Sequence, residues 1–110
     1  MNLTKKEKAL LRQLAHEAWK AELDAELEKL FEDFGRWADK GMSAFDLSDK
    51  IHEFHNGVSR ERYVFYANPD LPTAVSRAVA IGLLSEDALG ETLLEKLLPL
   101  IEVFKSMGSE

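Results

Sequence analysis

One unbroken helix pattern fills the first third of this sequence, from Thr4 to Lys40. Ala, Leu, Glu and Lys dominate the stretch, these residues are strong helix formers, and no proline interrupts them. Thr4 and Glu7 have the spacing of a capping box, which predicts the first turn. At about 1.5 Å per residue such a helix reaches roughly 54 Å, whereas a compact domain of this size is roughly 35 Å across. We therefore expect the helix to extend beyond its own domain.

The apolar residues of this helix lie on two stripes, roughly 170° apart at about 100° per residue. The first stripe consists of Leu11, Leu14, Ala18 and Ala21, and the second of Leu23, Leu27, Leu30, Phe34 and Trp37. Either the helix breaks near Glu22–Asp24, or it continues and each half buries its stripe against a different surface. Nothing in that region breaks a helix, so we expect continuity. A continuous helix of excess length predicts a two-fold homodimer that uses both stripes.

The charges on the helix divide at the same place. The first half is basic, whereas six acids and one lysine follow between Glu22 and Asp33. An antiparallel second copy would set the basic half against the acidic half. The alternative is that the acids form a solvated face with no partner.

Length and charge limit the remaining possibilities. The chain has 110 residues, a net charge of −6 and no cysteine, which fits a single domain over residues 1–110. The negative charge argues against nucleic acid and anionic membranes as partners. Without cysteine, disulfides and thiolate metal sites are excluded. No run approaches the roughly 18 apolar residues of a membrane span, so we expect a soluble cytoplasmic protein.

Caps and glycines divide the rest of the chain into shorter helices. Gly41 is expected to end the long helix, and Ser43 to begin the next one. Gly57 and Ser59 predict a second boundary, and Gly82 a third. The predicted helices are residues 4–40, 44–56, 60–67, 72–81 and 86–106, with a kink or break near Pro99 in the last. The expected fold is all-α, with a long N-terminal helix and a compact bundle of shorter helices, completed by dimerisation.

The segment His52–Tyr63 carries the most suggestive chemistry. His52 and His55 are three residues apart on a predicted helix, so both imidazoles can reach one metal ion. A metal site needs three or four ligands, and neither a repeated Glu-x-x-His nor the zincin His-Glu-x-x-His occurs here. Any metal site in this segment would therefore depend on His52 and His55 together with ligands that the pattern does not identify.

The same segment also has features of an anion site. Free amides after Ser59 would form a helix N-terminus, and Arg60 and Arg62 would add positive charge beside Tyr63. A small acidic ligand, or a carboxylate of a partner, would suit such a site. The alternative is that Ser59 is a plain helix cap and the arginines pair with neighbouring glutamates.

No catalytic motif is present. The sequence lacks a nucleophile elbow, a phosphate-cradling loop and a glycine fingerprint. We therefore favour a non-catalytic protein–protein interaction or regulatory module that acts as a homodimer, requires no cofactor and binds no nucleic acid. The competing hypothesis is a metal-binding or small-anion-binding protein, or an enzyme, that uses the His52–Tyr63 segment.

Overall fold

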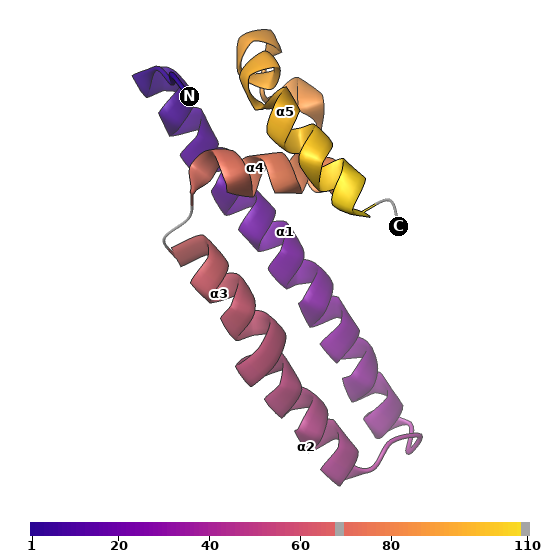
Figure 1. Cartoon of the computed structure of the whole chain (residues 1–110). Helices are drawn as coiled ribbons and strands as arrows, with labels where there is room; N and C mark the ends of the chain where they lie inside the picture. Colours follow the sequence, from indigo (N-terminus) through magenta and orange to yellow (C-terminus); the bar gives the residue numbers. More distant parts are fainter. Residues whose placement is uncertain (68–69, 109–110) are drawn as a thin grey trace. The chain divides into compact units, whose positions relative to one another are not determined.

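The computed structural model describes residues 1–67 and 70–108, and the regular structure of these residues is entirely helical (Figure 1). The elements are α1 (Lys5–Ala38), α2 (Ala44–Glu53), the π-helical turn η1 (Phe54–Ser59), α3 (Arg60–Ala67), α4 (Leu71–Ala80), the 3-10 turn η2 (Glu86–Ala88) and α5 (Glu91–Gly108). The all-α prediction is confirmed. Because α2, η1 and α3 follow one another without interruption, the described residues form four helical rods rather than five.

Helix α1 is continuous, as expected. The capping box is present: the Thr4 amide donates to the Glu7 carboxylate at 2.9 Å, and the Glu7 amide donates to the Thr4 hydroxyl at 3.0 Å. The helix then runs from Lys5 to Ala38, about 50 Å at 1.5 Å per residue. The alternative of a break near Glu22–Asp24 is therefore wrong.

The C-terminus of α1 differs from the prediction. Lys40, and not Gly41, adopts the left-handed backbone conformation, with a φ of 65°. The Gly41 amide donates to the Arg36 carbonyl at 2.8 Å, and the Lys40 amide donates to the Trp37 carbonyl at 3.0 Å. These two bonds form a Schellman motif in which a lysine occupies the position that usually belongs to glycine.

The packing divides the chain into two compact units, which we describe separately. The first unit contains residues 1–19 and 68–110, and the second contains residues 20–67. In the first unit, α4 packs against α5. Its buried apolar side chains include Leu11, Leu14, Ala15 and Ala18 from α1, Ala74, Val75, Ala78 and Val79 from α4, Leu89, and Leu93, Leu97 and Ile101 from α5.

Glycines shape the turns of the first unit. Gly82 has a φ of 87° and follows α4, and the Leu83 amide donates to the Ala78 carbonyl at 2.9 Å. Gly82 therefore ends the helix as predicted. The last helix begins later than predicted, at Glu91, because Gly90 has a φ of 78° and separates η2 from α5. No break occurs at Pro99, which lies inside α5.

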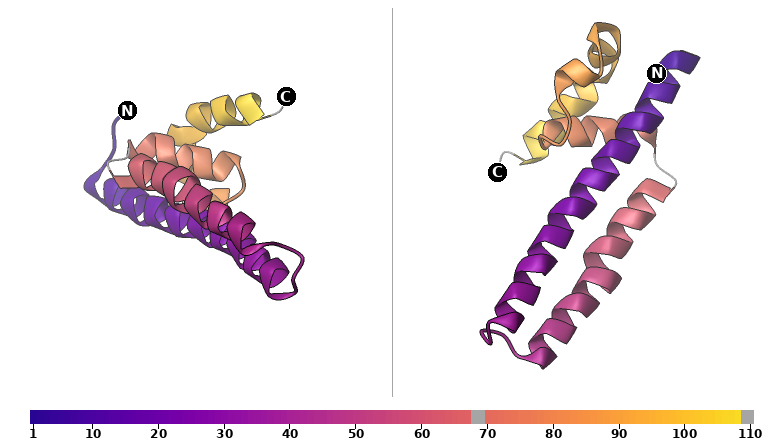
Figure 2. Two further views of the ribbon diagram at one scale, coloured as in Figure 1. Left: turned by 90° about the horizontal axis from the view of Figure 1, so that it is seen from below. Right: turned by 180° about the vertical axis from the view of Figure 1, so that it is seen from behind.

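The second unit is a helical hairpin. The rod formed by α2, η1 and α3 runs antiparallel to the second half of α1 and lies beside it (Figures 1 and 2). Ser43 caps α2 as predicted, accepting the Asp46 amide at 3.0 Å. The predicted boundary at Gly57 and Ser59 is wrong, because both residues lie inside η1 and the chain continues helically into α3. A π turn accommodates one extra residue in the rod, so no turn is needed there.

Candidate interaction surface

The hairpin of residues 20–67 has a very small core. Only Glu22, Leu47 and Tyr66 are buried in it, and one of these three is a carboxylate. Most of the large apolar side chains that the described residues expose also belong to this hairpin. They are Leu27, Phe31, Phe34, Trp37, Phe45, Ile51, Tyr63 and Val64. The hairpin therefore leaves on its surface much of the apolar area that a folded unit normally buries.

Two polar contacts from α3 fix the register of the hairpin. The Tyr66 hydroxyl donates to Oε2 of Glu22 at 2.7 Å, and Nε of Arg62 lies 3.5 Å from Oε1 of the same carboxylate. A buried carboxylate is tolerated when a cation and a hydrogen-bond donor compensate it. The 44-residue separation of Glu22 and Tyr66 in the chain kept this cluster out of reach of sequence analysis.

The side of the hairpin that bears Lys29 and Lys50 is polar. A cavity of about 180 Å³ there is lined by Glu26, Lys29, Leu30, Asp33, Lys50, Glu53, Phe54 and Val58. An ion pair joins Lys29 to Glu26 at 3.1 Å, and another joins Lys50 to Glu53 at 3.7 Å. We call this side the polar groove.

The opposite side of the hairpin is apolar. On α1, Leu27 and Phe34 lie about 100° around the helix from Glu26 and Asp33, away from the polar groove. On α2, Leu47 and Phe54 point toward α1. Ile51 lies about 50° around the helix from their mean direction, on the side away from Lys50. These side chains are about equally accessible: Leu27 is 43 % exposed, Phe34 41 % and Ile51 40 %.

Further residues complete this surface. Tyr63 of α3 is 59 % exposed. It directly follows Arg62, which points at Glu22, so its side chain lies about 100° further around α3, toward the same side of the hairpin as Ile51. Phe31 is 78 % exposed, beside Leu27 and Phe34 on α1. We call the surface formed by Leu23, Leu27, Phe31, Phe34, Ile51 and Tyr63 the apolar face.

The two apolar stripes predicted on α1 differ in how far they are buried. Leu11, Leu14 and Ala18 of the first stripe are buried within the single chain, so they are not available to a partner. In the second stripe, Leu30 points into the hairpin and lines the polar groove. The remaining members, Leu23, Leu27, Phe34 and Trp37, are partly buried or exposed, and Trp37 is 45 % exposed.

The His52–Tyr63 segment has a different geometry from the one predicted. His52 and His55 are exposed on α2 and η1. Within residues 1–67 and 70–108, no three His, Cys, Asp or Glu side chains gather closely enough to hold a metal ion. The chain is already helical before Ser59, so no free helix N-terminus follows it. The Arg60 amide, which was expected to be free, donates to the Gly57 carbonyl. Arg62 points to Glu22, while a hollow of about 310 Å³ is lined by His55, Asn56, Ser59, Arg60 and Tyr63.

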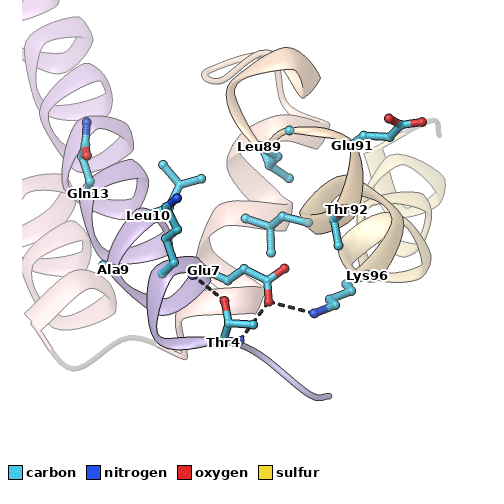
Figure 3. A pocket seen from close by; sticks show the side chains of 12 residues that line it. Thr4, Glu7, Ala9, Leu10, Gln13, Leu89, Glu91, Thr92 and Lys96 are labelled. Carbon is cyan, nitrogen blue, oxygen red and sulfur yellow. Dashed lines mark hydrogen bonds and ion pairs between the residues drawn. The ribbon is translucent and has the colours of Figure 1, made fainter.

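A second, separate groove lies in the first unit between the starts of α1 and α5 (Figure 3). It has a volume of about 680 Å³, and the side chains of Leu10, Leu89 and Leu93 contribute to its lining. Its polar end is the Glu7–Lys96 ion pair at 2.7 Å. Its lining also includes the polar residues Lys6, Gln13, Glu91 and Thr92.

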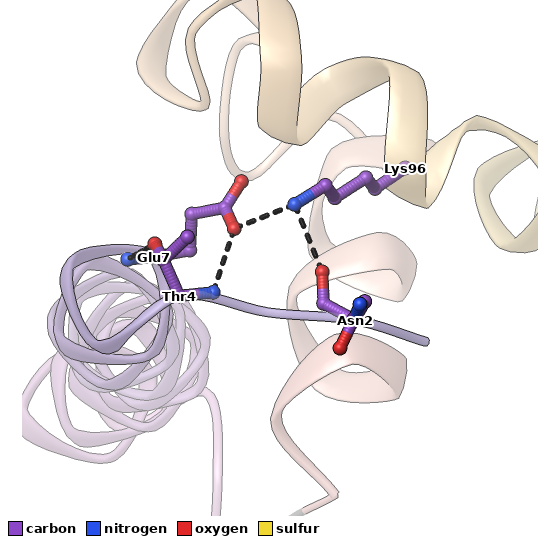
Figure 4. A network of polar contacts seen from close by, with 4 residues as sticks. All are labelled: Asn2, Thr4, Glu7 and Lys96. Carbon is purple, nitrogen blue, oxygen red and sulfur yellow. Dashed lines mark hydrogen bonds and ion pairs between the residues drawn. The ribbon is translucent and has the colours of Figure 1, made fainter.

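Lys96 connects two parts of the first unit (Figure 4). Its ammonium donates to the Asn2 carbonyl at 2.8 Å and to the Glu7 carboxylate at 2.7 Å. The hydrogen bond from Lys96 lowers the pKa of Glu7, and the Thr4 amide lowers it further. The network ties the chain start to α5.

Comparisons with known proteins identify no relative. No protein-family model, no curated protein and no solved structure matches this chain. Among the described helices, none is both long enough and apolar enough to cross a membrane. Any functional assignment therefore depends on the surfaces described above.

Proposed function

We propose that this chain is a non-catalytic protein-interaction module that acts as a homodimer, with the apolar face of the hairpin as its contact surface. The observation that carries the proposal is the concentration of exposed large apolar side chains on the hairpin, whose own core contains only three buried residues. Contiguous apolar surface of this kind marks protein contact sites in soluble proteins.

The energetics of the hairpin support a partner. Most helical stability in proteins comes from packing an apolar face against a neighbour, and burial contributes about 25 cal/mol per Å² of apolar surface. Leu47 and Tyr66 are the only apolar side chains buried in residues 20–67. A second copy would cover Leu27, Phe34 and Ile51 without requiring any other protein, and two-fold dimers are the commonest assemblies.

The proposal also narrows the surface predicted from sequence. Leu23, Leu27 and Phe34 of the second stripe stay in the proposed contact surface. Leu11, Leu14 and Ala18 of the first stripe are left out of it, because they are buried within the chain. We place the dimer in the cytoplasm, in keeping with a chain that has no cysteine and a charged-residue content of 31 %. A further protein partner would then bind to the assembled dimer.

The test compares two substitutions by aspartate in the full-length protein, one on the apolar face and one outside the hairpin. Phe34→Asp introduces a charge on the apolar face, and we expect it to raise the dimer dissociation constant by at least about tenfold. Leu98→Asp is the matched control: Leu98 is 40 % exposed, close to the 41 % of Phe34, and it lies on α5 in the first unit, outside the hairpin. Sedimentation equilibrium measures both constants. Equal dissociation constants for the two variants would contradict the proposed surface.

A further inference from the structure

The two rods of the hairpin carry different charges. On α1, the segment from Glu22 to Arg36 has six acids and two bases. On the α2–α3 rod, from Ala44 to Ala67, there are four acids, three bases and two histidines. In a face-to-face dimer, pairing α1 with its own copy would bring two acidic helices together. Pairing α1 with the α2–α3 rod of the second copy reduces this repulsion, because the rod has a net charge of −1 where the α1 segment has −4.

From this charge distribution we infer the arrangement of the dimer: the two hairpins form an antiparallel four-helix bundle in which α1 of each copy packs on the α2–α3 rod of the other. The inference rests on the proposed function. The two-fold axis runs parallel to the helices, so every neighbouring pair in the bundle is antiparallel. This is the geometry of ordinary four-helix bundles, and it encloses Leu27, Phe34 and Ile51 of both copies.

The register of the hairpin identifies one ion pair at the rim of the bundle. Within one copy, Glu22 is level with Tyr66, and Leu30 lines a cavity with Phe54 and Val58. By interpolation Glu28 is level with Val58–Ser59, within about two residues of Arg60. A two-fold axis parallel to the helices preserves these positions along the bundle, so Glu28 of one copy comes within about two residues of Arg60 of the other, a distance that the long arginine side chain can span.

The angular positions of the two side chains agree with this pairing. Glu28 lies about 100° beyond Leu27, on the flank of α1 that faces away from α2. Arg60 lies about 160° from Arg62, which points inward to Glu22, so it occupies the outer flank of α3. Both flanks are on the same side of the proposed contact. Glu28 and Arg60 are exposed, and neither forms an ion pair within residues 1–67 and 70–108.

Charge reversal in the full-length protein tests the arrangement. Glu28→Arg and Arg60→Glu should each raise the dimer dissociation constant, because either substitution creates two like-charge contacts per dimer. We expect an increase of roughly 3- to 30-fold at low salt that shrinks as salt is added. The double variant Glu28→Arg/Arg60→Glu should restore the wild-type constant. Lys50→Glu is the matched control, since Lys50 lines the polar groove and its reversal should leave the constant unchanged.

The possible results separate the arrangement from the proposed function. Weakening by each single reversal and recovery in the double variant would establish the arrangement. If the wild type is a dimer and all three variants have its dissociation constant, the arrangement is overturned and the dimer itself stands. The same holds if Glu28→Arg alone lowers the dissociation constant. A wild-type protein that is monomeric throughout would overturn both.

Discussion

Replacing Tyr66 by Phe removes one hydroxyl from the centre of the hairpin and leaves the ring in place. That hydroxyl donates to the buried Glu22 carboxylate at 2.7 Å, and the Tyr66 side chain is 5 % exposed. Hydrogen bonds to charged groups contribute about 1.5–3 kcal/mol. Arg62 still faces Glu22 in the variant, so the carboxylate keeps a cation. We therefore expect a loss of about 2 kcal/mol in the free energy of unfolding.

This loss is large enough to measure. It corresponds to a factor of about 30 in the unfolding equilibrium constant and to a fall of roughly 8 °C in the melting temperature. Urea and thermal unfolding followed by circular dichroism report both quantities, and hydrogen exchange should locate the loss of protection in residues 20–67. Glu61→Gln in the same helix is the control, because Glu61 is exposed and its substitution should change stability by less than about 0.5 kcal/mol. Equal stability of Tyr66→Phe and Glu61→Gln would refute the stabilising role of the Glu22 contact.

Two further predictions concern single positions. Lys40→Gly should stabilise the protein by about 1 kcal/mol, because glycine adopts the left-handed conformation of Lys40 without a steric penalty, whereas Gly82→Ala should destabilise it for the converse reason. Thermal unfolding measures both, and a less stable Lys40→Gly variant or a more stable Gly82→Ala variant would contradict the left-handed conformation at that position. The ion pair of Glu7 should stabilise the fold at neutral pH, and because the pKa of Glu7 is lowered in the folded state, that contribution is present above the usual glutamate pKa of about 4.3 and is lost as the pH falls through the folded pKa. Glutamine can close a capping box as glutamate does, so Glu7→Gln removes the charge and keeps the cap. The melting temperature of the variant should therefore be below that of the wild type at neutral pH, and the two should converge in acid. A difference that persists in acid would rule out the charge as its cause.

The sequence determined the local features of the fold well. Thr4 with Glu7, Ser43 and Gly82 were identified as helix boundaries from chemistry that acts within a few residues, and each is confirmed. Gly57 failed as a boundary because a π turn keeps the rod helical there, and glycine in a helix is only a modest penalty. Lys40 was missed because the favoured residue, Gly41, is its immediate neighbour.

The tertiary features could be predicted only in part. The change of side between the two stripes of α1 was visible in the sequence, and it coincides with the point where the chain passes from one compact unit to the other. Which stripe the chain itself would cover was not visible, because that depends on the packing of distant helices. Burial of Leu11 and exposure of Leu27 follow from that packing and not from the residues themselves.

The mass of the assembly in solution tests the central claim most directly. Native mass spectrometry of the untagged wild-type protein reports subunit count and bound mass together. We predict a species of twice the 12.5 kDa chain mass with nothing else attached. A species of one chain mass at every concentration reached would contradict the account, because the apolar face would then remain uncovered in the native protein.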